Sequence, residues 1–375
     1  MTAHGIVVFS LEPWDEIWRR NQYLVDGMLR ADPALRVLFV EPARDLVHGA
    51  LHRREVRRGG GLRPADGYEG RLALLEPTKW LPRLAGPVAD AMLRREVDAA
   101  RTAHGLATAP VWVNDPGWAH YVRRRGHRVL YDVTDDWTAA RRPPRQHRMV
   151  VENENILLDL CDEVVVCSVG LQATLGIRRK VRILTNAVDV ARYRQAYERP
   201  ADLPAAGTAL YVGTLHEDRL DVGLTARTAA RLREQGDVLV LVGPNALGGA
   251  QSAQLQSAGA VLLGPRPFGA VPAYLQHASV LIVPHVVDDF TDSLDPIKLY
   301  EYRAVGRPVV ATPIAGFRGL DEEGVSIVDG SEFPDAVAAL AAESMPTVLR
   351  AGVPDWSDRA AEMGEIVRDV GSRSQ

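Results

Sequence analysis

The sequence predicts an α/β protein with two doubly wound domains. Short continuous runs of Val, Ile and Leu alternate with longer segments of helical pattern, and this rhythm occurs twice along the 375 residues. Continuous apolar runs of this length indicate strands that are buried on both faces of a parallel sheet. A stretch rich in Pro, Ala and Gly, residues 198–208, separates the two series. Ligands are therefore expected at the carboxyl edges of the strands.

Each series supplies a set of expected strands. The first set is residues 6–11, 37–40, 72–75, 111–113, 129–133, 164–167 and 181–184. The second set is residues 209–212, 238–242, 261–263, 280–283, 309–311 and 326–328. Intervening segments such as 227–234 and 271–277 have the pattern of crossover helices. Residues 43–70 lack periodicity and are rich in Arg and Gly, so a mobile loop is expected there.

These patterns divide the chain into three regions. Residues 1–187 form the N-terminal domain and residues 188–352 form the second domain, with the boundary near the segment from Thr185 to Asp189. Residues 353–375 read as an amphipathic helix after Pro354, and we expect it to pack back on the first domain.

Composition favours a protein of the reducing cytoplasm. Hydrophobic residues make up 46% and charged residues 25%, which is enough for two separate cores. No run of about eighteen apolar residues predicts a transmembrane helix. The first residues lack the layout of a signal peptide. The two cysteines, Cys161 and Cys167, match neither a disulfide framework nor a zinc site and are expected to fill the core.

The net charge of −4 hides an asymmetry. Residues 1–187 carry 28 basic and 23 acidic residues, a balance of +5, whereas the rest carry 16 and 25, a balance of −9. The excess lies in the clusters Arg53-Arg54, Arg57-Arg58, Arg123-Arg124-Arg125, Arg141-Arg142 with Arg145, and Arg178-Arg179-Lys180. These clusters are either solvated loops and helix ends or a contact for an anionic partner or membrane surface. No aromatics are interleaved with them, so nucleic acid is not an expected partner.

Several well-known motifs are missing. The chain has neither G-x-G-x-x-G nor G-x-x-x-x-G-K-[ST], which argues against a dinucleotide oxidoreductase and a P-loop nucleotidase. H-E-x-x-H and G-x-S-x-G are absent as well. What does recur is a glycine directly after a strand of the second half, at Gly213, Gly243 and Gly264. Glycine there allows a loop to approach a ligand closely, although each one alone fits an ordinary strand–helix turn.

The order of the segments carries a resemblance. In sequence they are Thr185–Asp189, Leu210–Leu215, Leu241–Pro244, Leu262–Pro265, Tyr274–His285 and Lys298–Thr312. This order is similar to the family-4-like GT-B glycosyltransferases, also called glycosyl transferases group 1. Residues 284–312 most resemble a subgroup with a D/N-P-x-K-L-x-E-Y donor motif. The resemblance covers residues 185–320 and implies a GT-B fold, in which an acceptor-binding and a nucleotide-sugar-binding Rossmann-like domain face a central cleft.

The resemblance also implies a donor site. Glu301 matches the glutamate that accepts hydrogen bonds from the ribose hydroxyls, and Lys298 matches a contact of the diphosphate. The residues expected to bind the donor are Gly213, Thr214, Leu215, Arg219, Gly243, Pro244, Pro265, His285, Thr291, Ser293, Lys298, Leu299 and Glu301. The alternative is that Lys298 and Glu301 form an exposed (i, i+3) ion pair on a surface helix.

Three positions depart from the family pattern. Ser293 stands where many relatives have a first glutamate, seven residues before the second. Thr214 and Leu220 stand where relatives often have an arginine and a lysine, with Arg219 nearby. Two phosphate cations are thus absent or relocated, which gives Lys298 more importance. It is the only lysine of residues 188–375, which otherwise use arginine.

The first domain is expected to supply the acceptor site. Asp135 and Asp136 follow the expected strand 129–133, in a segment that resembles the Y-D-x-x-D-D-W of the same subgroup. Either could deprotonate an acceptor hydroxyl, and either could instead cap the next helix. The residues expected at the acceptor are Glu12, Trp14, Arg20, Asp115 and Trp137, where Trp14 could equally belong to the core.

Together these patterns predict a metal-independent glycosyltransferase that needs no cofactor. Its donor is expected to be a nucleoside-diphosphate sugar such as a UDP-sugar, and its acceptor a hydroxyl of a polysaccharide, glycolipid or natural product. Two alternatives remain: a GT-B-type nucleotide-sugar epimerase, and a non-catalytic family member that acts as a partner protein. The expected location is cytoplasmic, with the basic loops allowing peripheral contact with a membrane.

Overall fold

The chain divides into two compact units. The computed structural model describes residues 4–46, 57–80, 87–123, 126–140, 142–205, 207–288, 291, 293–343 and 346–372. Unit 1 comprises Met1–Cys167, Leu171–Thr185 and Trp356–Gln375, and unit 2 comprises Ser168–Gly170 and Asn186–Asp355. The chain therefore returns to unit 1 at its C-terminal end.

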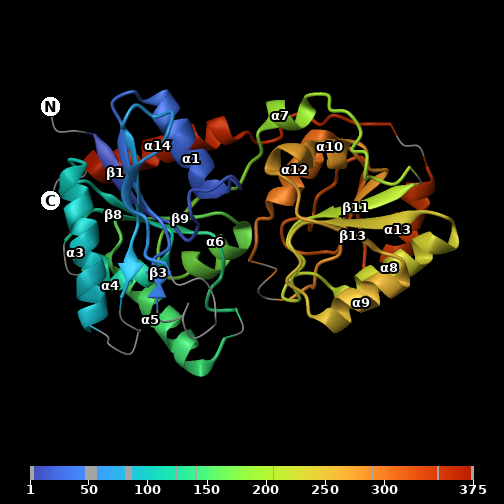
Figure 1. Cartoon of the computed structure of the whole chain (residues 1–375), viewed down its shortest axis with the longest axis horizontal. Helices are drawn as coiled ribbons and strands as arrows, with labels where there is room; N and C mark the ends of the chain where they lie inside the picture. Colours follow the sequence, from blue (N-terminus) through green and yellow to red (C-terminus); the bar gives the residue numbers. More distant parts are fainter. Residues whose placement is uncertain are drawn as a thin grey trace. The chain divides into compact units, whose positions relative to one another are not determined.

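Unit 1 is built on an eight-stranded sheet with the order β10-β9-β8-β7-β1-β2-β5-β4. Strands β1, β8 and β9 of this sheet are labelled in Figure 1. The strands are β1 (Gly5–Phe9), β2 (Arg36–Val40), β4 (Gly61–Pro64), β5 (Leu72–Glu76), β7 (Val111–Val113), β8 (Val129–Val133), β9 (Glu163–Val166) and β10 (Arg182–Ile183). All pairs are parallel except β4 with β5. A small second sheet joins β3 (Arg44–Asp45) to β6 (Thr78–Lys79).

The helices of unit 1 cover this sheet. They are α1 (Arg20–Ala31), α3 (Pro87–Ala103), η2 (Pro116–Trp118), α4 (Ala119–Arg123), α5 (Pro144–Leu160), α6 (Val169–Gly176) and α14 (Trp356–Ser372). The C-terminal helix α14 packs along α1. There the rings of Tyr23 and Trp356 stack with centroids 4.9 Å apart. Close approach requires a glycine at Gly27, because a Cβ there would lie 2.4 Å from the Cβ of Ala360.

Unit 2 has a six-stranded parallel sheet with the order β13-β12-β11-β14-β15-β16. Its strands are β11 (Thr208–Val212), β12 (Val238–Val242), β13 (Val261–Gly264), β14 (Val280–Val283), β15 (Val309–Ala311) and β16 (Val325–Ile327). Its helices are α7 (Val190–Arg194), α8 (Val222–Glu234), α9 (Gly249–Ala258), η3 (Phe268–Ala270), α10 (Val271–Gln276), α12 (Ile297–Val305) and α13 (Phe333–Ala342).

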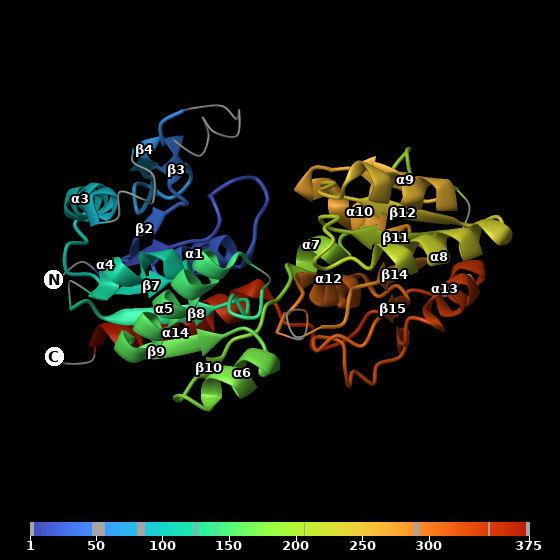
Figure 2. The same ribbon diagram turned by 90° about the horizontal axis from the view of Figure 1, so that it is seen from below.

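Helices lie on both faces of the unit 2 sheet (Figure 2). On one face Leu210 of β11 shares a core cluster with residues of α7, α10 and α12. On the other face its neighbour Tyr211 shares a cluster with residues of α8 and α13. Because consecutive strand residues point to opposite faces, one continuous apolar strand supplies both cores.

The predicted doubly wound architecture is confirmed, since a strand occurs at each of the apolar runs named above. The expectation of an unstructured loop over residues 43–70 was wrong for its described part. That part contains β3 and β4, and β4 pairs antiparallel with β5 at the edge of the sheet. An edge strand of sequence Gly-Leu-Arg-Pro has no apolar run of its own, so only its partner defines it. Cys161 and Cys167 are buried free thiols.

Candidate functional site

The strands of unit 2 reverse their order at one place. Strand β11 is flanked by β12 and β14, so the connections lead away from β11 in opposite directions along the sheet. In open α/β sheets this switch point leaves a crevice at the carboxyl ends of the strands, where ligands bind. Gly213 follows β11 and His285 follows β14, so both predicted donor residues lie at this edge.

Two glycines allow close packing at the switch point. Gly213 and Gly243 have φ angles of 149° and 141°. A Cβ on Gly243 would lie 2.1 Å from the carbonyl oxygen of Gly213, and a Cβ on Gly213 would lie 2.6 Å from Nζ of Lys298. The glycines therefore let the two loops stack and bring the Lys298 ammonium onto the backbone that follows β11.

The ammonium of Lys298 is unpaired within the described part of the chain. Its Nζ lies 5.1 Å from the centroid of the Tyr211 ring, a cation–π contact, and no carboxylate of the described residues is within ion-pair distance. Lys298 is the second residue of α12, and no side chain caps the amino end of that helix. An unpaired cation beside a helix amino end is a favourable place for a phosphate group.

Glu301 lies one turn further along α12. Its Oε1 accepts a 2.5 Å hydrogen bond from the hydroxyl of Tyr193 in α7. Burial raises the pKa of the Glu301 carboxyl, and this effect is opposed by the Tyr193 hydrogen bond and the charge of Lys298. Lys298 and Glu301 thus face inward, toward Gly213 and Tyr193 respectively, and do not form the exposed ion pair of the alternative interpretation.

His285 is a buried neutral group at the same edge. It is 2% exposed, and its Nε2 lies 3.3 Å from the hydroxyl of Tyr211. Burial lowers the pKa of His285 well below its ordinary value, and the charges of Lys298 and Arg219 add to this effect. Its Nδ1 is buried and has no hydrogen-bond partner. A buried polar atom of this kind is costly unless a ligand or water satisfies it.

The other predicted donor residues fall into two groups, those that are buried and those that are exposed on loops. The hydroxyl of Thr291 bonds to the carbonyl of Asp288, and Leu215 and Leu299 are buried among apolar side chains. Ser293 is buried, and its carbonyl accepts a hydrogen bond from Ser168. The remaining residues, Thr214, Pro244, Pro265 and Arg219, are exposed on loops that follow the strands.

Asp295 of the donor motif has a structural task. Its Oδ2 accepts a hydrogen bond of 2.5 Å from the backbone amide of Asn186, and its Oδ1 accepts one of 2.7 Å from Tyr300. The side chain of Asn186 also donates to the Asp295 carbonyl. This carboxylate therefore fixes the start of α12 to the first residues of unit 2 and holds Lys298 in place.

In unit 1 the two adjacent aspartates differ in their surroundings. Oδ1 of Asp136 accepts hydrogen bonds from the amides of Thr138 and Ala139 and from the Thr138 hydroxyl, at 2.7–3.0 Å. Asp136 thus caps the following turn. Oδ2 of Asp135 accepts a 3.3 Å hydrogen bond from the hydroxyl of Thr134.

Arg20 is engaged in the interior of unit 1. Its guanidinium makes two hydrogen bonds to the buried carboxylate of Asp132, at 3.0 and 3.1 Å, and another to the carbonyl of Thr185. Breaking such a buried pair is strongly destabilising. The predicted role of Arg20 in acceptor binding is therefore secondary to this structural one.

Glu12 and Trp14 lie on the loop after β1. Glu12 pairs with Arg19 at 3.4 Å, and both side chains are partly exposed. The Trp14 ring packs edge-to-face on Phe39, with centroids 5.1 Å apart, and its backbone amide donates to Glu41. Trp14 thus belongs to a partly exposed aromatic cluster, and its role at the acceptor stays a prediction.

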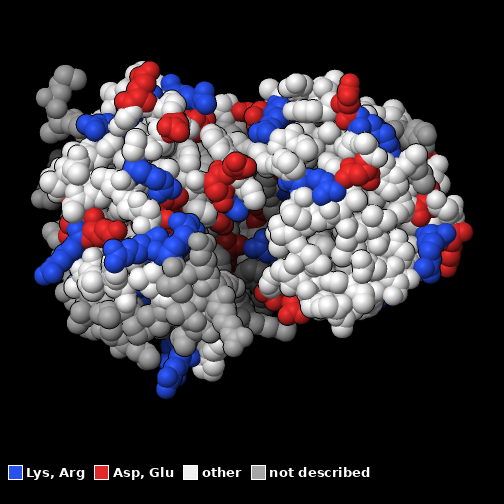
Figure 3. Space-filling model, in the orientation of Figure 1, with Lys and Arg blue, Asp and Glu red and all other residues white. Residues whose placement is uncertain are grey.

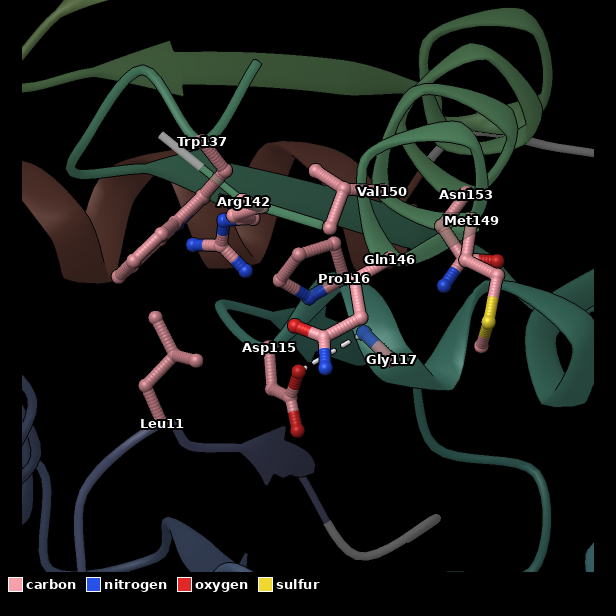
Figure 4. Close-up of a pocket in the computed structure, with 10 residues that line it drawn as sticks. All are labelled: Leu11, Asp115, Pro116, Gly117, Trp137, Arg142, Gln146, Met149, Val150 and Asn153. Atoms are coloured by element: carbon pink, nitrogen blue, oxygen red, sulfur yellow. Dashed lines mark hydrogen bonds between the residues drawn. The ribbon is translucent and has the colours of Figure 1, made fainter. Parts of the chain in front are cut away.

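Asp115 and Trp137 line a pocket of about 150 Å³ in unit 1 (Figure 4). The pocket lies at the carboxyl ends of three neighbouring strands, since Leu11 follows β1, Asp115 follows β7 and Trp137 follows β8. The switch point of this sheet lies between β1 and β7, where a ligand site is expected. The full lining is Leu11, Asp115, Pro116, Gly117, Trp137, Arg142, Gln146, Met149, Val150 and Asn153.

Sequence reasoning missed three residues that shape these sites and one buried glutamate whose charge interacts with Asp136. Tyr193 contacts Glu301 and Tyr211 contacts Lys298, and neither tyrosine was among the predicted site residues. Arg142 was seen only as part of a basic cluster. Glu154 lies buried in α5, and burial raises its pKa to about 7, with a further contribution from the Asp136 charge. A helical face of α5, formed by residues 146, 149, 150 and 153, was the signal that could have indicated the pocket.

Neither a metal cluster nor a membrane span is found in the described part of the chain. No group of three or more His, Cys, Asp and Glu residues there could hold a metal ion. No helix there is both long and apolar enough to cross a bilayer.

Comparison with known proteins places these sites in context. Residues 206–345 match the family described as glycosyl transferases group 1. The chain is 26% identical over 230 residues to a putative teichuronic acid biosynthesis glycosyltransferase, TuaH, of Bacillus subtilis. That alignment takes in 56% of this chain and 57% of the relative, little more than half of each.

Solved structures align over nearly the whole chain. Sucrose-phosphate synthase from Thermosynechococcus elongatus aligns with a TM-score of 0.70 at 16% identity, covering 99% of this chain and all of that one. HepE from Anabaena, solved with UDP and glucose, aligns with a TM-score of 0.64 at 13% identity, covering 98% and 97%. The predicted GT-B fold class is thereby confirmed.

Proposed function

We propose that this chain is a glycosyltransferase that transfers a sugar from a nucleoside-diphosphate sugar to an acceptor hydroxyl. The observation that carries the proposal is the ammonium of Lys298, which has no carboxylate partner among the described residues and lies over Gly213 at the switch point of unit 2, one turn before Glu301. The match of residues 206–345 to the glycosyl transferases group 1 supports it. Neither that match nor the relatives named above support the epimerase alternative.

In this proposal unit 2 binds the donor nucleotide at two groups, its diphosphate and its ribose. The diphosphate binds between Lys298 and the amino end of α12, and the ribose hydroxyls donate to Glu301. Tyr193 holds one carboxylate oxygen, so the other is directed to the sugar hydroxyls. UDP is the first nucleotide to test, because HepE has been solved with UDP.

In this proposal the positive charge at the site also favours departure of the diphosphate. As the bond from the sugar to the diphosphate breaks, negative charge develops on the leaving diphosphate. A fixed ammonium and helix amides stabilise that charge without reorganisation. Asp135 is the proposed base that accepts the proton of the attacking hydroxyl. We propose that this arrangement needs no metal ion, so turnover should be unchanged by EDTA.

The test is a thermal-shift screen of nucleoside diphosphates on the purified chain, followed by a sugar-transfer assay with the nucleotide that binds. A ligand at a hundredfold its dissociation constant stabilises the folded state by about 2.7 kcal/mol, which gives a measurable shift. Stabilisation by one nucleoside diphosphate and not by its nucleoside is the expected result. A chain that none of the common nucleoside diphosphates stabilises would refute the proposal and favour a non-catalytic partner protein.

We further propose that unit 1 contacts an anionic membrane surface. Exposed side chains at the edge of unit 1 support this, because Arg58 lies 4.5 Å over the ring of Trp80, which is 40% exposed, and Leu62 is 43% exposed. Charges of both signs are spread over the surface in Figure 3, and part of the basic set is paired, as Arg57 is with Glu76. Arg53, Arg54, Arg124, Arg125 and Arg141 of the predicted clusters lie outside the described residues. The test is co-sedimentation with anionic vesicles at low and high salt. A chain that does not sediment with the vesicles at either salt concentration would refute the membrane contact.

A further inference from the structure

The pocket of unit 1 has a composition that specifies its ligand. It combines an aromatic ring, a carboxylate and a guanidinium, contributed by Trp137, Asp115 and Arg142 (Figure 4). Its volume of about 150 Å³ is about ten times the 10–15 Å³ that one water molecule requires. That space suits one sugar ring rather than an oligosaccharide.

The guanidinium of Arg142 is stacked but not neutralised. It lies 5.0 Å from the centroid of the Trp137 ring, and its Nε is buried without a hydrogen-bond partner. No ion pair joins Arg142 to any described carboxylate, including that of Asp115 in the same pocket. A buried guanidinium donor that is left unpaired is costly, and a bound anion would relieve that cost.

The amino end of α5 adds to this positive potential. Its N-cap residue is Pro143, no side chain caps the helix, and its first turn has no acidic residue. Gln146, the third residue of the helix, lines the pocket. The uncapped amides of this turn and the Arg142 guanidinium thus favour the same sign of charge in a ligand.

Asp115 and the apolar wall complete the set of interactions. Oδ1 of Asp115 accepts a 2.7 Å hydrogen bond from the amide of Gly117, which fixes the carboxylate at the carboxyl end of β7. A fixed carboxylate accepts hydrogen bonds from sugar hydroxyls. Met149, 43% exposed, and Val150 lie on one face of α5 and offer an apolar surface to the ring of a ligand.

We propose that this pocket binds an acidic sugar unit, that is, a sugar ring bearing a carboxylate or a phosphate, as the acceptor. Arg142 binds the anionic group, Asp115 accepts from ring hydroxyls, and Trp137 contacts the face of the ring. The identification of this ligand as the acceptor rests on the proposed function, whereas its binding does not. The Arg142 guanidinium is the specificity determinant, because a neutral sugar would leave its charge without an anionic partner among the described residues.

The experiment titrates the purified chain with three matched sugars and follows protein signals by NMR. Methyl β-D-glucuronide carries a carboxylate, glucose 6-phosphate carries a phosphate, and methyl β-D-glucoside is neutral. The wild type is expected to bind at least one charged sugar about tenfold more tightly than the neutral one. Arg142→Gln should abolish that preference, and Arg142→Lys should retain part of it. Arg148→Gln, on an exposed position of α5, should leave the preference intact.

The outcomes separate this proposal from the proposed function. Preference for the carboxylate or for the phosphate identifies the anionic group. Equal affinity for all three sugars, absence of binding by both charged sugars, or a preference that survives in Arg142→Gln would overturn the acidic-acceptor proposal. UDP is titrated into the same samples as a separate arm. If the wild type binds UDP and any of those three results is obtained, only the acidic-acceptor proposal is overturned. If the wild type does not bind UDP, the result counts against the proposed glycosyltransferase function.

Discussion

The hydroxyl of Tyr193 donates a 2.5 Å hydrogen bond to Oε1 of Glu301, although the two residues lie 108 positions apart. The same bond that orients the carboxylate also favours its ionised form, against a burial that raises its pKa. Because recognition of ribose hydroxyls requires an acceptor, the hydrogen bond from Tyr193 preserves the state of Glu301 that the proposed nucleotide site requires.

The first prediction is that Tyr193→Phe weakens UDP binding about tenfold, in the range expected for a hydrogen bond to a charged group. Loss of the donor allows the pKa of Glu301 to rise further, so the deficit should be larger at pH 6 than at pH 8. Calorimetric titration at both pH values measures this. Tyr197→Phe is the matched control, and equal affinities of the wild type and Tyr193→Phe at both pH values would contradict the role of Tyr193.

Lys298 should act on the phosphates and not on the nucleoside. At an effective dielectric constant of about 20, an ammonium 4 Å from a phosphate charge gains about 4 kcal/mol before desolvation. Lys298→Met is therefore expected to weaken UDP binding by about thirtyfold or more while uridine binding stays the same. Lys180→Met, at an exposed position in unit 1, should change neither affinity. An equal loss for UDP and uridine would indicate that Lys298 supports the fold rather than the diphosphate.

Gly213 tests whether the position of that ammonium matters. An alanine Cβ there would lie 2.6 Å from Nζ of Lys298, and the φ of 149° disfavours any side chain. Gly213→Ala is expected to weaken UDP binding about tenfold and to lower the melting temperature. Gly249→Ala is the control, because nothing lies within 4 Å of its added Cβ and it starts helix α9. Unchanged UDP affinity in Gly213→Ala would show that the ammonium can move without loss.

The sequence was sufficient to predict which glycines follow the strands of unit 2 and which helix carries Lys298 and Glu301. The glycines after β11 and β12 are local features, since their φ angles are required by turns that follow buried strands. Lys298 and Glu301 lie on one helix, so their spacing alone places them one turn apart. The sequence could not predict which side chains Lys298 and Glu301 contact, because Tyr193 and Tyr211 approach α12 from distant parts of the chain.

The acceptor side was less predictable for the same physical reason. Arg20 was expected near a substrate, yet its guanidinium pairs with Asp132, 112 positions later. The sequence around a charged residue that follows a strand does not show whether its partner is a ligand or a buried carboxylate. Arg142 shows the reverse case, since a residue in an arginine-rich segment faces a pocket whose walls come from four separate segments.

The two adjacent aspartates of unit 1 should separate into a catalytic and a structural residue. Asp135→Asn is expected to lower turnover by a factor of 10² or more without changing UDP affinity, as for loss of a general base. Asp136→Ala should instead reduce stability by about 1 kcal/mol, because it removes the Oδ1 that accepts hydrogen bonds from Thr138 and Ala139. Single-turnover assays and chemical unfolding of both variants measure this. Full turnover in Asp135→Asn would remove it as the base.

Glu154 should make the folded state less stable as the pH rises. It is 8% exposed, and burial, with the charge of Asp136 adding to it, raises its pKa from 4.5 to about 7. Between these two values the folded state holds a proton that the unfolded state has lost, so stability falls as the pH increases through this window. Each pKa unit corresponds to about 1.4 kcal/mol, which sets an upper limit of about 3 kcal/mol for the loss. Glu154→Gln removes the ionisation, so its melting temperature should exceed that of the wild type by more at pH 8 than at pH 5. Glu152→Gln is the control, because Glu152 is exposed on the same helix and its replacement should give no pH-dependent difference in melting temperature. If the melting temperatures of the wild type and Glu154→Gln differ by the same amount at both pH values, the raised pKa of Glu154 is contradicted.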